Sequence, residues 1–245
     1  MTFMAHRRAN PPWIATAVVL LSLPLSAHAQ FDVTIYSGMS DSQNSDVQLT
    51  QPANTDLTFH NVSWDDKSLD NPVYWGARLT YWFPHAERWG MAVDFTHAKI
   101  HAELGATVNV TGTRAGSTVN DQEVLGNTFS VLAMSHGFNL LTINALYRWK
   151  PKPHLQPFVG FGAGLAYPHV EVQTNSSYTD EYQLAGWVLN GMTGLNYDLG
   201  KGFALFAEYK ISYADMKADL SDGGTLKTKV WTNHLNLGVT YHFGQ

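Results

Sequence analysis

Cysteine is absent from all 245 residues of the chain. Its absence excludes disulfide bonds, cysteine metal ligands, a cysteine nucleophile and a lipid anchor attached to a cysteine. Beyond residue 29 the chain also lacks any run of 18 consecutive apolar residues, so we expect no later segment to cross a bilayer as a helix. If the mature chain spans a membrane, it must do so as a closed β-barrel.

Positive charge is scarce as well. Without the two arginines of residues 1–29, the chain has 13 Lys and Arg against 20 Asp and Glu, a net charge of −7. Phosphate backbones repel such an acidic chain, so we expect no nucleic-acid partner. Aromatic residues, in contrast, make up 13% of the sequence and include eight Trp, which is a high content.

Residues 1–29 differ in composition from the rest of the chain. The pair Arg7-Arg8 gives a positively charged start, an apolar run occupies about residues 13–25, and Ala27-His28-Ala29 has the small-any-small pattern that signal peptidase cleaves. The apolar run is too short to span a bilayer as a helix. We therefore predict a signal peptide at 1–29 and a secreted single domain at 30–245.

The last stretch of the chain alternates in polarity. Apolar side chains occupy nearly every second position from Val230 to Phe243, which is the period of a β-strand. Asn236, Gly238, Tyr241 and Phe243 also resemble the C-terminal signal by which bacterial outer-membrane barrels are handed to their insertion machinery. Taken alone, this stretch fits a half-buried strand of a soluble β protein equally well.

Eight segments of the mature chain share this alternation. They are roughly Phe31–Ser40, Pro72–Phe83, Trp89–Ala102, Phe138–Lys150, Gln156–Val172, Tyr182–Leu199, Gly202–Ala214 and Thr228–Phe243. Short connections at 84–88, 151–155 and 200–201 alternate with long loops at 41–71 and 103–137, which is typical of outer-membrane barrels. The pattern predicts an all-β fold, an eight-stranded antiparallel transmembrane β-barrel of up-and-down meander topology, in the bacterial outer membrane with both termini periplasmic.

The face opposite the apolar one carries charged and amide side chains. In a soluble lipocalin-like barrel this face would point to water, but aromatic strand ends and the secretion signal favour the inverted arrangement. Because eight strands leave an interior just wide enough for side chains, we expect an internal ion-pair network and no wide pore. Its predicted members are Arg78, Asp94, Arg148, Glu208 and Lys210.

Ionisable groups gather at the predicted outer ends of the strands. His97 and Lys99 continue a lipid-facing row, either as an ordinary rim pair or as contacts to lipid phosphates and sugars. His169 and Glu171 are two apart on a strand and so lie on one face, within about 7 Å. An imidazole and a carboxylate so placed could share a divalent metal or a proton.

Several long phrases of the chain resemble the outer-membrane lipid A oxidases. They are WGMAVDFTHAKIHAE (89–103), GFNLLTINALYRWK (137–150), PFVGFGAGLAYPHVEV (157–172), EYQLAG (181–186) and FAEYKISYADMKADLSDGGTLKT (206–228). They occur in the same order, and the resemblance runs from about Pro72. It implies an enzyme that uses O2 to oxidise the reducing-end glucosamine of lipid A to aminogluconate, with no organic cofactor and with a divalent metal ion.

The expected partners are lipid A or lipopolysaccharide in the outer leaflet and the barrel insertion machinery. We expect His169 and Glu171 to be metal ligands as well as catalytic groups. The other candidates are His97, Glu208 and Lys210 for catalysis and Lys99, His101 and Tyr213 for substrate binding. The alternative is a non-enzymatic small barrel. It could be a structural or adhesion-type surface protein, or a porin-like channel, although the narrow interior of an eight-stranded barrel disfavours the channel.

Overall fold

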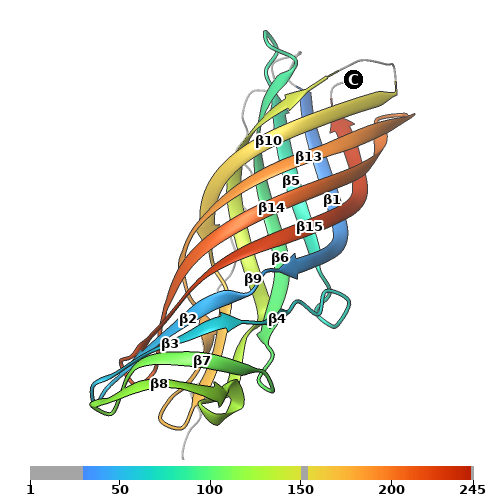
Figure 1. The fold of residues 1–245 in the computed structure, drawn as a ribbon. Helices are drawn as coiled ribbons and strands as arrows, with labels where there is room; N and C mark the ends of the chain where they lie inside the picture. The colour runs from blue at the N-terminus through green and yellow to red at the C-terminus, as the bar shows by residue number, and fades with distance from the viewer. Residues whose placement is uncertain (1–29, 150–153, 244–245) are drawn as a thin grey trace, which may run out of the picture.

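A computed structural model describes residues 30–149 and 154–243 (Figure 1). Eight strands form a closed antiparallel ring, in which β1 pairs with both β5 and β15. They are β1 (Gln30–Ser42), β5 (Trp75–Trp82), β6 (Trp89–Ala102), β9 (Phe129–Arg148), β10 (Leu155–Ala166), β13 (Gly186–Gly200), β14 (Phe203–Asp219) and β15 (Thr225–Phe243). This confirms the predicted eight-stranded antiparallel barrel. The predicted signal peptide, 1–29, lies outside the described residues.

The helical content is small. The short 3-10 turn η1 (Leu125–Asn127) connects β8 to β9. Within the described residues, no helix has the length and apolarity needed to cross a membrane.

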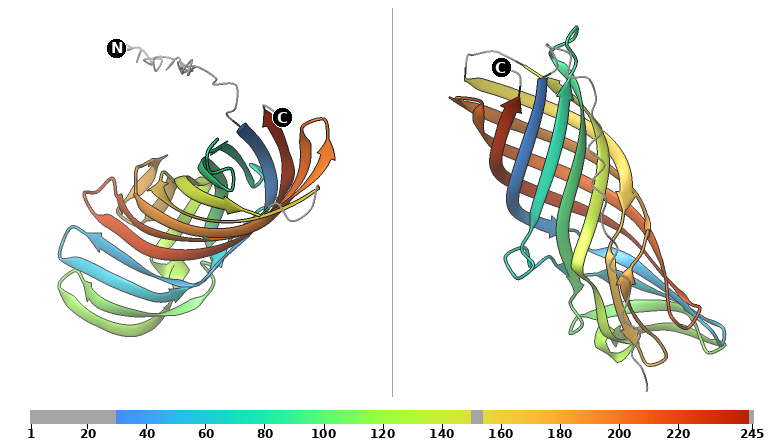
Figure 2. Two further views of the ribbon diagram at one scale, coloured as in Figure 1. Left: turned by 90° about the horizontal axis from the view of Figure 1, so that it is seen from above. Right: turned by 180° about the vertical axis from the view of Figure 1, so that it is seen from behind.

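Further strands form an extension beyond one end of the ring (Figures 1 and 2). Strands β2 (Ser45–Gln51), β3 (Thr55–Val62), β7 (Thr107–Arg114) and β8 (Ser117–Val124) continue the sheet from β15. The short β4 (Trp64–Asp65) pairs with β6, β11 (His169–Thr174) pairs with β9, and β12 (Tyr178–Tyr182) pairs with β11. The prediction of long loops at 41–71 and 103–137 is therefore wrong, because most of both segments is folded into strands.

Two predicted strand boundaries are also wrong. The single strand expected over 156–172 is divided at Tyr167-Pro168 into β10, which pairs with β13, and β11, which pairs with β12. Proline has no N–H for a sheet ladder, so it is a natural place for the chain to change partner. The strand expected from Tyr182 begins only at Gly186, because Tyr182 belongs to β12.

The outside of the ring is apolar. Ile35, Phe161 and Leu237 are 64%, 62% and 64% exposed, which suits a wall that faces lipid and not water. Aromatic pairs mark the two edges of this wall. Near the short turns they are Trp89–Tyr147 and Phe203–Tyr241, and at the other end they are Trp187–Tyr213 and Tyr213–Trp231.

The two aromatic belts define the membrane-spanning part of the ring. Along β14, Phe203 in the lower belt and Tyr213 in the upper belt are about ten residues apart, the length that a tilted strand needs to cross the hydrocarbon. The extension and the strand ends above the upper belt therefore lie outside the membrane.

Inside the membrane-spanning part, the lumen holds paired charges. Arg78 Nη2 lies 3.0 Å from Asp94 Oδ2 and 2.7 Å from Glu208 Oε2, and Lys210 Nζ lies 2.8 Å from Asp94 Oδ2. Each of these four side chains is at most 3% exposed, so protein fills the lumen at this level. The predicted ion-pair network is confirmed for these four residues.

Arg148, the fifth predicted member, lies outside this network. Its guanidinium sits 4.0 Å from the Trp82 ring at the short-turn end, and its Nε donates to the backbone oxygen of Glu87 at 2.9 Å. Residue 148 is too close to the end of β9 to reach the charged layer.

The extension has the opposite polarity to the lumen. Its interior is apolar, with the rings of Phe59 and Phe129 in contact at 5.1 Å and both fully buried. Val47, Leu49, Leu57 and Val110 belong to the same core. Water surrounds the extension, so apolar side chains point inward there, whereas lipid surrounds the ring and its polar faces point inward.

Candidate functional site at the outer wall

The outward-facing residues of β6, β9, β11 and β12 meet just above the upper belt. His101 on β6 opposes Ala133 on β9, Ala133 opposes Glu171 on β11, and Glu171 opposes Asp180 on β12. Directly opposed residues project from the same face of a sheet. His169, two positions from Glu171, projects from that face as well.

Residues Ser135 and His136 of β9 connect the two predicted metal ligands. Ser135 Oγ donates a hydrogen bond to Glu171 Oε2 and lies 2.9 Å from His136 Nδ1. The His136 and His169 rings are 4.9 Å apart, and His169 Nε2 is 3.4 Å from Asp180 Oδ1. We call His101, Ser135, His136, His169, Glu171, Asp180 and Tyr182 the outer-wall cluster.

Tyrosine rings flank the cluster on one side. Tyr182 packs on His169 at 4.7 Å, donates from its hydroxyl to the backbone oxygen of His136 at 3.0 Å, and stacks on Tyr167 at 5.6 Å. Tyr167 and Tyr182 are both about half exposed. Exposed aromatic rings at this depth are suited to the boundary between acyl chains and sugars.

The histidines of the cluster retain unused ring nitrogens. Nδ1 of His101 and Nδ1 of His169 are buried without a hydrogen-bond partner in the part of the chain that the structure describes. Burial lowers the pKa of His101, Lys67 and Lys99 lower it further, and Asp65 and Glu171 oppose the shift. His101, which lies above the upper belt, is therefore a neutral imidazole near pH 7, able to accept a proton.

His97 and Lys99 do not join the cluster. His97 is 8% exposed, its Nδ1 lies 2.8 Å from Asn139 Oδ1, and its ring stacks on Trp75. Lys99 is only 3% exposed, and its Nζ donates to the backbone oxygen of Asp70 at 2.8 Å. His97 keeps the lipid-facing register, opposite Trp75 and Asn139, although neighbouring side chains cover it. The expectation that Lys99 continues this row is wrong, because the register of β6 shifts between residues 98 and 100 and a loop covers Lys99.

Three other predicted site residues lie elsewhere. Glu208 and Lys210 point into the lumen, 2% and 1% exposed, on the far side of the wall from the cluster. Tyr213 lies in the upper belt between Trp187 and Trp231. The structure thus brings together His101, His169 and Glu171 of the predicted set.

Sequence reasoning missed four members of the cluster. Ser135 and His136 fall in a segment that was predicted to be a loop, and Asp180 and Tyr182 lie on or near a strand boundary that was misplaced. The available signal was the Tyr178–Tyr182 segment, whose alternation is too short to recognise without its partner β11.

The cluster can perform proton transfer. It combines the carboxylate of Glu171, the hydroxyl of Ser135 and the imidazole of His136 within hydrogen-bond reach of one another. Among the described residues, no group of three or more His, Asp or Glu is placed to hold a metal ion. The predicted metal ligands His169 and Glu171 therefore stay a prediction.

Comparison with known proteins identifies the family of the chain. The family model described as "Outer membrane protein beta-barrel domain" matches residues 15–243. Similar solved structures include OprG from Pseudomonas aeruginosa, with 14% identity over 88% of this chain and 96% of that one at a TM-score of 0.47. The outer membrane protein AlkL has 15% identity over 99% and 97% of the two chains, also at 0.47.

Neisserial surface protein A is a further similar structure, with 12% identity over 88% of this chain and 97% of that chain at a TM-score of 0.43. No curated protein matches the chain. These similarities are too weak to transfer any activity.

Proposed function

Because the chain belongs to the outer membrane protein β-barrel domain family, and so resides in the bacterial outer membrane, we propose that it modifies lipid A there. The proposed reaction is O2-dependent oxidation of the reducing-end glucosamine to aminogluconate. The observation that carries the proposal is the outer-wall cluster, which gathers ionisable groups on the outside of the barrel just above the lipid-facing wall.

The position of the cluster suits a substrate that never leaves the membrane. Charged groups next to hydrocarbon are costly, so their concentration at one depth favours a functional role over a random surface. We propose that both termini are periplasmic, in which case the extension projects from the cell and the cluster lies at the level of the lipid A sugars. Lipid A could then reach Glu171 by lateral diffusion.

The reaction balances with O2 and water as co-reactants. The C1 carbon loses two electrons and two protons as its hemiacetal becomes a lactone, and O2 accepts both to become H2O2. Water then opens the lactone to the acid, so the sugar gains one oxygen atom in total. In this proposal Glu171 accepts the C1 hydroxyl proton, Ser135 holds that carboxylate in place, and His169 orients the sugar.

A divalent metal is part of the proposal, with His169 and Glu171 as two of its ligands. When bound, it would supply a Lewis acid beside the sugar. The described residues arrange no third His, Asp or Glu ligand beside this pair, and the proposed proton transfer to Glu171 does not depend on the metal.

Mass spectrometry of lipid A tests the proposal. The gene is expressed in a host that produces 1-dephosphorylated lipid A and lacks this oxidation. We expect a gain of one oxygen in the expressing cells and none when oxygen is excluded. An unchanged lipid A mass in cells with folded protein in the outer membrane would reject the proposal.

A non-enzymatic surface protein is the second candidate, and the extension favours it. Strand β8 pairs with β7, and most of its side chains on both faces are exposed, so it presents a long strand at the edge of the extension. Removal of residues 107–124 would then abolish attachment of cells to surfaces without changing lipid A. Attachment that is unaffected by this removal would argue against the adhesion role.

A further inference from the structure

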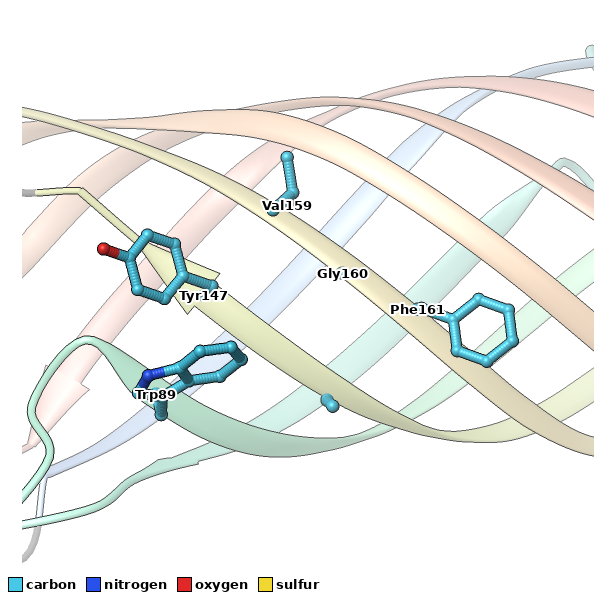
Figure 3. A pocket seen from close by; sticks show the side chains of 6 residues that line it. Trp89, Tyr147, Val159, Gly160 and Phe161 are labelled. Atoms are coloured by element: carbon cyan, nitrogen blue, oxygen red, sulfur yellow. The ribbon is translucent and has the colours of Figure 1, made fainter.

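A shallow apolar hollow lies on the lipid-facing wall near the short turns (Figure 3). Its volume is about 630 Å³, and it is lined by Trp89, Ala145, Tyr147, Val159, Gly160 and Phe161. Ala145 lies ten residues along β9 from Ser135 of the outer-wall cluster. The hollow is therefore a separate feature at the opposite edge of the membrane.

The hollow exists because the small side chain of Ala145 lies among large ones. Ala145 faces lipid and is opposed by Met91 on β6 and Phe161 on β10. The rings of Trp89 and Tyr147, 4.9 Å apart, form one bank, and Phe161, which is 62% exposed, forms the other (Figure 3). An apolar chain that lies over Ala145 would contact aromatic rings on both sides.

A second recess continues the hollow toward the water. It has a volume of about 580 Å³ and is lined by Ala86, Glu87, Arg88, Trp89 and Tyr147. Trp89 and Tyr147 line both recesses, so the two form one groove that is apolar on the wall and charged at the turn. We call this combined surface the wall groove. Arg88, at its charged end, is exposed.

We propose that the wall groove binds one glycerophospholipid, with an acyl chain over Ala145 and the phosphate at Arg88. The apolar half faces hydrocarbon, so only a membrane lipid can reach it. Arg88 supplies the charge and the N–H donors that a phosphate requires. Aromatic rings between the two halves lie at the membrane interface, where they contact the glycerol region.

The choice of a glycerophospholipid over lipid A follows from the position of the groove. The groove lies at the end of the barrel where β1 begins and β15 ends, beside the short turn between β5 and β6, whereas the outer-wall cluster lies at the end with the extension (Figure 1). With periplasmic termini, this end faces the phospholipid leaflet. The site is independent of lipid A oxidation and is tested without an activity assay.

Native mass spectrometry of the delipidated full-length barrel in detergent tests the site, with palmitoyl-oleoyl phosphatidylglycerol as the probe. Arg88→Gln removes the phosphate contact, and Ala145→Leu fills the hollow. The matched controls are Lys201→Gln, at another short turn, and Ala163→Leu, at another lipid-facing alanine of the wall. A heat-modifiable band verifies folding, and Ala145→Met replaces Ala145→Leu if the latter fails to fold.

We expect the wild-type barrel to retain one lipid and Arg88→Gln to bind it roughly tenfold more weakly, as for loss of a charge-assisted hydrogen bond. Ala145→Leu should weaken binding by a similar factor, and both controls should stay within about twofold of the wild type. Equal binding by a variant and its control at either position would overturn the proposal. So would preference for lipid A over phosphatidylglycerol in direct competition.

Discussion

At the scale of single residues, the buried charges of the lumen depend on one another. Arg78 is held between Asp94 and Glu208, and Lys210 donates to Asp94, Tyr36 and Thr96. Such groups are tolerated away from water only because each charge meets an opposite charge or a hydrogen-bond partner. Removing one partner therefore costs more than the pair contributes.

We predict that Glu208→Ala destabilises the barrel by about 3 to 5 kcal/mol, because Arg78 loses one of its two carboxylate partners in a buried layer. Reversible urea unfolding in lipid vesicles measures the change. Glu181→Ala, at an exposed position in the extension, is the matched control and should change stability by less than about 0.5 kcal/mol. A Glu208→Ala barrel as stable as this control would mean that the lumen is hydrated.

Ser135 is predicted to position Glu171 in the outer-wall cluster. Ser135→Ala should lower kcat for lipid A oxidation roughly tenfold with little change in KM, because a hydrogen bond to a charged group is lost. Ser135→Thr keeps the hydroxyl and should restore most of the rate. Equal rates for the Ala and Thr variants would show that the hydroxyl has no part in the reaction.

At the scale of elements, the extension is stabilised by an apolar core, whereas the interior of the ring is stabilised by paired charges. Phe59→Ala should lower the free energy of unfolding of the extension by about 3 to 5 kcal/mol, because a fully buried ring is lost from its core. We expect faster hydrogen exchange in β2, β3 and β7 and unchanged exchange in the ring. Thr58→Ala, next to Phe59 on β3, is the control. Faster exchange throughout the ring would show that the ring and the extension are not packed separately.

The junction of β8 and η1 is predicted to loosen in acid. Burial raises the pKa of Glu123, but hydrogen bonds from Arg114 and Thr128 outweigh it and leave the pKa below its usual value. The stabilisation is therefore present above the unfolded-state pKa of about 4.3 and is lost as pH falls through the folded-state pKa. Hydrogen exchange at β8 should become faster as pH falls through this range, and Glu123→Gln should abolish the pH dependence.

How far the sequence predicts these elements depends on what surrounds them. Strands of the ring alternate clearly because one face meets lipid and the other a polar lumen, so all eight were found. Strand β8 is exposed on both faces and carries no apolar period, so it was predicted to be loop. Ser135 and His136 were missed because the upper part of β9 was assigned to that loop. Leu132, Ala133 and Met134 are consecutive and all buried, so alternation is absent there too.

At the scale of the whole molecule, the barrel separates two sets of ionisable groups by its wall. Glu208 lies in the lumen among paired charges, and Glu171 lies outside, with Ser135 as its hydrogen-bond donor. The sequence assigned Glu208 to the inner ion pairs and also, with Glu171, to the candidate site, because alternation gives the face of a strand but neither the depth nor the contacts across strands. The inner set therefore stabilises the barrel, and the proposed chemistry belongs to the outer set.

The most direct test of this assignment compares lipid A oxidation by two matched variants, Glu171→Gln and Glu208→Gln, measured by mass spectrometry of lipid A from cells that express each one. Both should show the heat-modifiable band of a folded outer-membrane barrel. We expect Glu171→Gln to leave lipid A without the added oxygen and Glu208→Gln still to add it. Oxidation by a folded Glu171→Gln barrel, together with its loss in a folded Glu208→Gln barrel, would contradict the assignment of the chemistry to the outer-wall cluster.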